Sequence, residues 1–95
     1  MRYVIHAYDH TDPDALDRRM QFRPDHLAFV RQLKTAGQFV FGGALLDPSG
    51  NMIGSMLLLE LETDAQLQDY LQTDPYIVEG VWDKIDAKPF RQADV

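Results

Sequence analysis

Two consecutive apolar segments, 38–46 and 52–61, constrain the fold of this chain more than any other feature. They read QFVFGGALL and MIGSMLLLEL, and the turn-forming residues DPSGN lie between them, so they predict a β-hairpin. A strand of an antiparallel sheet that meets water on one face alternates apolar and polar side chains. Here apolar side chains fill consecutive positions, as in the run MLLL at 56–59. Both faces of the hairpin therefore need a cover.

The rest of the chain adds two strands and two helical regions. The pattern between the first strand and the hairpin is helical, but Pro24 lacks the N–H that a helix interior uses, so we expect a break there. The predicted elements are strands over 2–9 and 81–91 and helices over 14–21, 24–36 and 65–72, the last followed by a short helical turn after Asp74-Pro75.

The order strand, helix, strand, strand, helix, strand predicts a ferredoxin-like βαββαβ fold of the α+β class, with one antiparallel sheet and its helices on one face. Two helices cover one face only, while the hairpin is apolar on both. Because closed two-fold homodimers are the commonest oligomers, we expect a homodimer in which the uncovered sheet faces of two copies meet. A loop folded over that face is the alternative. The 95 residues leave little chain for it, and we expect them to form a single domain, 1–95.

Charge and composition exclude several classes of protein. The chain has 15 acidic and 9 Lys or Arg residues, a formal charge of −6, which argues against nucleic-acid binding. Apolar residues at 45% argue against intrinsic disorder. The sequence contains no cysteine, so disulfides and thiolate chemistry are excluded. We recognise no signal peptide or membrane span and expect a cytoplasmic protein.

His26, in the segment RPDHLAFVRQLKTAG, is the most informative candidate for chemistry. On a helical wheel it falls within the apolar arc of the predicted helix 24–36, so its ring faces inward. In the first turn of such a helix, the positive end of the helix dipole and partial desolvation would keep the imidazole neutral, as a general base requires. A core-edge histidine that hydrogen-bonds to backbone is the alternative.

Asp74, in TDPYIVEGV, is the second candidate. An Asp that precedes Pro at a helix start is typical of an N-cap, which is its structural role. If the same carboxylate reached His26, it would orient the imidazole and fix its tautomer. The two roles are compatible.

We expect a smaller part in the chemistry for the other polar residues. Arg23 immediately precedes the predicted helix and could grip an anionic substrate, with a surface ion pair as the alternative. His6 and His10 are about 13 Å apart along an extended strand, too far to share one ion, so we expect no metal site. Ser55 lacks a GxSxG elbow and is expected to form hydrogen bonds rather than act as a nucleophile.

Several segments together resemble the YCII-related domain (YciI-like) family along essentially the whole chain. They are the opening YVIHAYD, the stretch RPDHLAFVRQL followed by Gly37, the GG at 42–43, Gly54-Ser55, TDPYIVEGV and KPF at 88–90. The resemblance implies a dimeric ferredoxin-like α/β-barrel similar to muconolactone isomerase. It also implies a His and Asp active pair, which matches His26 and Asp74. The residues that would line the same cleft are Arg23, Gly43, Ser55 and Tyr76.

The function expected from residues and resemblance is that of a small cofactor-independent enzyme of the isomerase or lyase type. His26 would move a proton on a small metabolite, aromatic-derived or anionic, and Asp74 would orient it. The alternative is a non-catalytic dimeric module that binds a small ligand or acts as an accessory protein. An oxygenase or haem enzyme of the same fold finds no axial-ligand context in the sequence.

Overall fold

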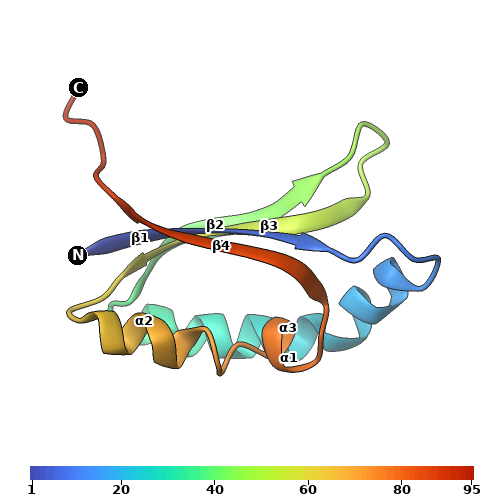
Figure 1. The fold of residues 1–95 in the computed structure, drawn as a ribbon, viewed down its shortest axis with the longest axis horizontal. Coiled ribbons are helices and arrows are strands. Elements are labelled where there is room, and N and C mark those ends of the chain that lie inside the picture. The colour runs from blue at the N-terminus through green and yellow to red at the C-terminus, as the bar shows by residue number, and fades with distance from the viewer.

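Four antiparallel strands form one sheet in the order β2-β3-β1-β4, and the helices lie together on one of its faces (Figure 1). This computed structural model covers residues 1–95. The ferredoxin-like α+β fold predicted from the order of elements is confirmed. The elements are β1 (Arg2–Asp9), α1 (Ala15–Thr35), β2 (Phe39–Leu46), β3 (Met52–Glu60), α2 (Asp64–Tyr70), α3 (Pro75–Val78) and β4 (Trp82–Phe90).

The predicted break at Pro24 is wrong, because α1 runs through it as one helix of 21 residues. Proline in a helix interior removes the hydrogen bond to the carbonyl four residues earlier, at a cost of about 3 kcal/mol. Here Pro24 is exposed and Met20 is 47% exposed, so water can solvate the carbonyl that loses its partner. Packing of the inward face then keeps the helix continuous. Figure 1 shows the first turns of α1 inclined to the remainder, as a proline kink would produce.

The core lies between the sheet and the helices. Alternate residues of β1, Tyr3, Ile5 and Ala7, point toward the helices and are buried. Their partners across the ladder include Leu57 and Leu59 of β3, which are buried with them. The remaining members of this core come from the second half of the chain: Leu61, Leu67, Tyr70, Tyr76, Val81 and Trp82.

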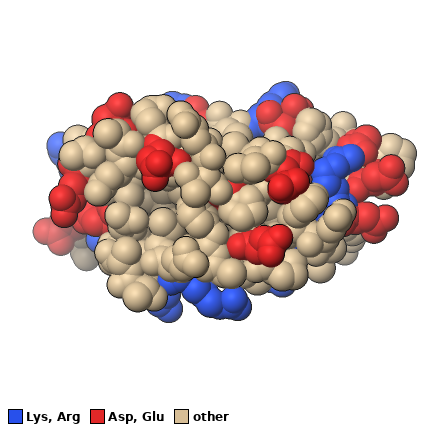
Figure 2. Space-filling model, turned by 90° about the horizontal axis from the view of Figure 1, so that it is seen from below, with Lys and Arg blue, Asp and Glu red and all other residues tan.

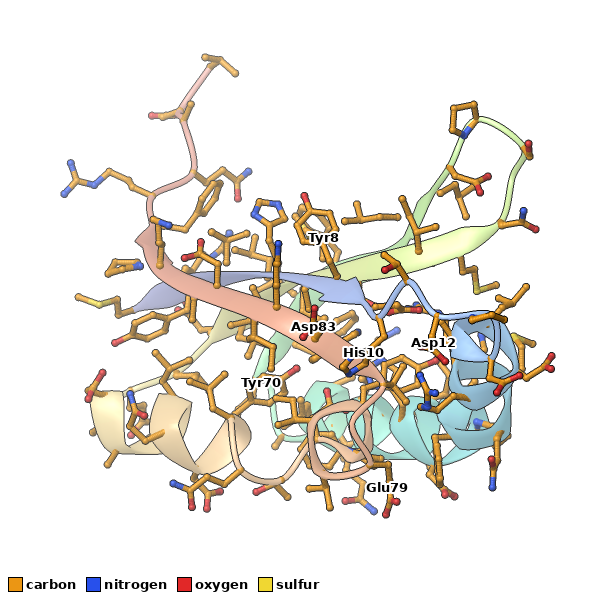
Figure 3. All side chains as sticks on the ribbon, turned by 45° about the vertical axis from the view of Figure 1, so that its right-hand side comes forward. Tyr8, His10, Asp12, Tyr70, Glu79 and Asp83 are labelled. Carbon is orange, nitrogen blue, oxygen red and sulfur yellow. The ribbon has the colours of Figure 1, made fainter.

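The opposite face of the sheet carries no helix. Figure 3 shows Tyr8 on this side and Tyr70 on the helix side. The centre of the open face is apolar: Leu58 is buried there, and Phe41, its partner in the ladder, is 54% exposed. The β4 positions of the same face carry Lys84, Asp86 and Lys88 instead. The expected apolar character therefore holds for β2 and β3, whereas β4 gives this face a charged border.

Charged side chains are spread over the helix side of the molecule. Seen from that side, acidic side chains are dispersed over the surface, and basic ones lie around its margin (Figure 2). None of the helices combines the length and hydropathy that crossing a bilayer requires.

Two adjacent glycines of β2 differ in the space around them. A Cβ at Gly42 would overlap the carbonyl oxygen of Met56, whereas a Cβ at Gly43 would meet nothing within 4 Å. We predict that Gly42→Ala lowers the free energy of unfolding by about 1–3 kcal/mol, because the strands would have to separate. Gly43→Ala serves as the matched control and should change it little. Urea unfolding of both variants tests this, and equal midpoints would contradict the register of β2 on β3.

Candidate active site

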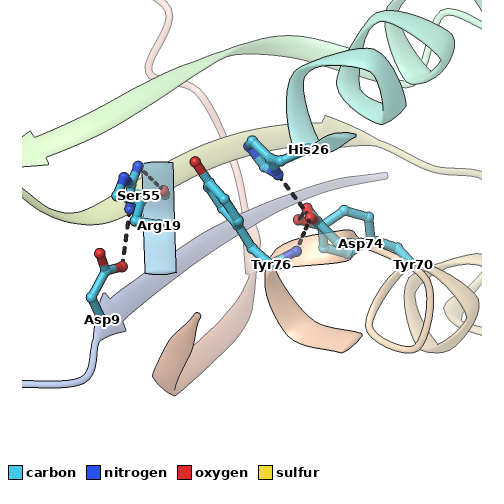
Figure 4. Close-up of polar contacts among 7 residues, drawn as sticks. All are labelled: Asp9, Arg19, His26, Ser55, Tyr70, Asp74 and Tyr76. Carbon is cyan, nitrogen blue, oxygen red and sulfur yellow. Dashed lines mark hydrogen bonds and ion pairs between the residues drawn. The ribbon is translucent and has the colours of Figure 1, made fainter. Parts of the chain in front are cut away.

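His26 and Asp74 meet in the interior although 48 residues separate them in the chain. Nδ1 of His26 lies 2.7 Å from Oδ1 of Asp74 (Figure 4). His26 projects from the middle of α1, and Asp74 is the N-cap of α3, where its side chain accepts a hydrogen bond from the backbone N–H of Tyr76. The N-cap role and the contact with His26 thus coexist, as the sequence had suggested.

The Asp74 carboxylate is fully buried and accepts three hydrogen bonds. Besides His26, it accepts from the Tyr70 hydroxyl at 2.7 Å and from the Tyr76 N–H at 3.0 Å. A carboxylate can only accept, so the Nδ1 of His26 that faces it carries the proton. In the neutral ring Nε2 is then left with a free lone pair, the arrangement of a general base.

Tyr70 is a permanent donor in this network. Burial, and then the negative charge of Asp74, raise the pKa of its hydroxyl well above the ordinary 10.0. The phenol therefore stays protonated at neutral pH, and it donates its hydrogen bond to Oδ2 of Asp74 there.

Aromatic rings hold the imidazole in place. The Tyr76 ring stacks on His26 with centroids 3.9 Å apart and an interplanar angle of 7°. Trp82 meets His26 edge to face at 5.8 Å. With Nδ1 on Asp74 and one ring face on Tyr76, only the other face and the Nε2 edge of His26 are left for contact with a ligand.

His26 also lines a pocket of about 220 Å³ between α1 and the strands β2 and β3. The pocket is smaller than sites that hold drug-sized ligands. Only two of its residues, His26 and Ser55, have polar side chains. The full lining is His26, Leu27, Val30, Phe39, Gly42, Gly43, Ser55 and Leu57.

A second buried polar cluster reaches the same pocket. Arg19, 3% exposed, donates from Nη1 to Oδ1 of Asp9 and from Nη2 to Oγ of Ser55, both at 2.9 Å. Its guanidinium lies 4.9 Å from the centroid of the Tyr76 ring, within cation–π range. Burial raises the pKa of Asp9, and the charge of Arg19 opposes that shift.

Sequence reasoning missed Arg19 and Asp9. The signal was present: Arg19 precedes His26 by seven residues, two helical turns, so one continuous helix puts both on one face. The assumed break at Pro24 concealed this relation. Asp9 likewise continues the inward alternation of β1 that includes Ile5 and Ala7.

Two of the four predicted cleft residues line the pocket, and two do not. Gly43 and Ser55 line the pocket. Tyr76 is fully buried behind His26 and does not line it. Arg23 lies in a neighbouring depression of about 290 Å³ with Met20, Pro24, Leu27 and Arg31, and only Leu27 borders both spaces.

The electrostatic argument for His26 needs correction. Because α1 begins at Ala15, His26 is not in a first helical turn, and the positive end of the helix dipole does not act on it. The hydrogen bond to Asp74 instead fixes the orientation and tautomer of its ring.

The other histidines lie elsewhere. His6 is exposed on the open face, and Nδ1 of His10 is 3.8 Å from the Asp83 carboxylate, next to it in Figure 3. No three His, Asp or Glu side chains converge in a way that could hold a metal ion.

Fold and site together define a class: ferredoxin-like α+β domains with a buried His and Asp pair at the wall of a small apolar pocket. The match to the family model spans residues 1–91. The chain belongs to the YCII-related domain family.

Curated relatives and solved structures agree with this assignment. Protein YciI of Escherichia coli O6:H1 is 33% identical over 98 residues, which cover 97% of this chain and 98% of that protein. An uncharacterized protein of Haemophilus influenzae has the same identity and coverage. Among solved structures, 5-chloro-2-hydroxyhydroquinone dehydrochlorinase of Burkholderia phenoliruptrix has a TM-score of 0.87 at 23% identity, covering 98% of this chain and 96% of its own. An antibiotic biosynthesis monooxygenase has a TM-score of 0.62 at 15% identity, covering 99% and 100%.

The hydroxyl of Tyr70 provides a direct test of the network around Asp74. We predict that Tyr70→Phe lowers the free energy of unfolding at neutral pH by about 1.5–3 kcal/mol, because a hydrogen bond to a buried carboxylate is lost. Urea unfolding measures this loss.

The same variant tests the raised pKa of Tyr70. Because the folded protein holds this proton more tightly than the unfolded chain, the stability that Tyr70 contributes is present below pH 10.0 and is lost as the pH rises above it. In Tyr70→Phe the alkaline decline in stability should be shallower. Tyr8→Phe, at a residue 49% exposed, is the control and should keep the wild-type decline. The same slope in all three proteins would refute the raised pKa.

Proposed function

We propose that this protein is a small cofactor-independent enzyme of the isomerase or lyase type, with His26 as its general acid and base. The observation that carries the proposal is the oriented pair: Nδ1 of His26 contacts the buried carboxylate of Asp74, and His26 is one of the residues that line a pocket. A base that is fixed in position and tautomer accelerates proton transfer by about 10² to 10⁴.

The pocket suggests the kind of substrate. It is small, its walls are mainly apolar, and its polar side chains face it from two sides, His26 on α1 and Ser55 on β3. A flat ring with oxygen substituents would suit such a space. The dehydrochlorinase with the same fold was solved in complex with 2,5-dihydroxybenzoquinone, a molecule of this kind. We therefore propose a small oxygenated ring, aromatic-derived or anionic, as the substrate class.

The proposed reaction needs only proton movements. Nε2 of His26 takes a proton from a hydroxyl or an activated C–H of the ring, and the electron pair left behind delocalises over the ring and its oxygens. The imidazolium, stabilised by Asp74, then returns the proton to another atom of the ring. In an elimination, a leaving group departs with the electron pair instead, and the imidazolium gives its proton to that group or to water. His26 ends as it began, so no redox partner is required.

The central test removes the imidazole. We predict that His26→Ala lowers the rate about 10² to 10⁴-fold while the protein stays folded, because the base is lost and the pocket walls remain. The measurement is incorporation of solvent deuterium into hydroxylated hydroquinones and quinones, followed by proton NMR. His10→Ala, at an exposed histidine outside the pocket, is the control. Wild-type exchange in His26→Ala would remove the proposal.

The competing hypothesis is a non-catalytic binding module. It is favoured by the same burial that holds the pair: Asp74 is fully buried and caps α3, so the bond to His26 also stabilises the fold. An NMR titration of the His26 ring separates the two. A ring that titrates in contact with solvent supports catalysis, whereas a ring that never titrates supports a structural bond.

We further propose that two copies form a homodimer through the open face of the sheet. This face exposes apolar side chains on β1 and β2, among them Tyr8 and Phe41. The charged border on β4 contains both signs, Lys84 and Lys88 with Asp86 between them, so a two-fold axis could pair opposite charges across the interface.

A charge placed on the open face tests the dimer. We predict that Phe41→Asp yields a monomer by light scattering at micromolar concentration, because it buries an unpaired carboxylate in the contact. Val78→Asp, at an apolar residue that is 61% exposed on α3, is the matched control and should remain dimeric. A monomeric mass for the wild type would contradict the proposal.

A further inference from the structure

The contact between Arg19 and Ser55 fixes the direction of a hydrogen bond at the pocket. A guanidinium has donors only, so at 2.9 Å the Oγ of Ser55 accepts from Nη2 of Arg19. The hydroxyl proton of Ser55 then cannot point at Arg19. Because Ser55 lines the pocket together with His26, the pocket is where that proton can find an acceptor.

Arg19 is held so that it cannot turn away. Asp9 binds its Nη1 at 2.9 Å, and the ring of Tyr76 lies against its guanidinium. Figure 4 shows the Tyr76 ring between the Arg19 cluster and His26. The Nε of Arg19 and the hydroxyl of Tyr76 are buried here without a protein partner. The positive charge of Arg19 is thus fixed behind Ser55, in surroundings of low polarity that strengthen its effect.

We propose that Arg19 is a positioning residue that makes Ser55 a fixed donor to a negatively charged oxygen of the substrate. The inference rests on the proposed function in one respect: it takes the pocket beside His26 as the substrate site. The inference adds the chemical group that is recognised at this site, which is a phenolate or enolate oxygen. A neutral hydroxyl, or a carboxylate held by Arg23, is not the group that Ser55 would bind.

The chemistry of the proposed reaction explains why such a donor is useful. When Nε2 of His26 removes a proton from the ring, the electron pair of the broken bond moves onto a ring oxygen, which becomes negative. The Ser55 O–H donates a hydrogen bond to that oxygen without giving up its proton. Hydrogen bonds to charged acceptors are roughly twice as strong as those to neutral ones, so this contact favours the ionised ring.

The test uses 4-nitrophenol, whose phenolate absorbs visible light, and measures binding at equilibrium without any turnover. We expect the wild type to bind the phenolate at least about tenfold more tightly than the neutral phenol, as a hydrogen bond to a charged group requires. Ser55→Ala should lose most of this preference. Ser49→Ala, at an exposed serine of the β2–β3 turn, is the matched control and should keep it.

Arg19 is tested by a paired variant, because removing it alone would leave Asp9 buried without its partner. The double variant Asp9→Asn with Arg19→Gln removes both charges and keeps a polar side chain at each position. It should lose the preference, as Ser55→Ala does, provided that circular dichroism shows a folded protein. In His26→Gln the preference should persist, since it originates on the other side of the pocket.

Three results would overturn the proposal: a full preference in folded Ser55→Ala, a full preference in the folded paired variant, or no binding of 4-nitrophenol by the wild type at millimolar concentration. None of these depends on activity. Loss of turnover in His26→Ala can therefore stand while this inference fails, and the reverse also holds.

Discussion

The buried carboxylate of Asp74 is the group on which the rest of the structure depends. It joins α1 through His26, the end of α2 through Tyr70 and the start of α3 through the N–H of Tyr76. A charge inside a protein is tolerated only when hydrogen bonds replace its water, and here three donors do so. Loss of a partner from such a buried pair costs about 3–5 kcal/mol, so the contact that orients His26 also holds the helical layer together.

A second buried pair, Arg19 with Asp9, contacts Ser55, which lines the pocket. Both Arg19 and His26 lie on α1, and both touch the ring of Tyr76. Their common orientation requires the helix to continue through Pro24. The continuous helix therefore keeps Arg19 and His26 on its inward face, at a fixed separation of two helical turns.

Much of this arrangement follows from local sequence. The apolar hairpin, the turn residues DPSGN and the Asp-Pro helix start lead to the observed strands and to α3, and the inward position of His26 follows from helical periodicity. The continuity of α1 through Pro24 could not be predicted from the sequence. A sequence pattern shows the local cost of a proline in a helix, but it does not show the tertiary packing that outweighs this cost. The Arg19 cluster was missed for the same reason. Tyr76 could be placed near the site but not behind the imidazole, since stacking depends on the path of α3 across α1.

Asp74 holds His26 in the tautomer with the proton on Nδ1, which leaves the lone pair on Nε2. Free histidine prefers the tautomer with the proton on Nε2, so the contact with Asp74 would have to reverse this preference. The most direct measurement is the ¹⁵N chemical shifts of the His26 ring at a pH where the ring is neutral, read from long-range ¹H–¹⁵N correlations. The account predicts a protonated Nδ1 and an unprotonated Nε2. A protonated Nε2 with a bare Nδ1 would contradict it.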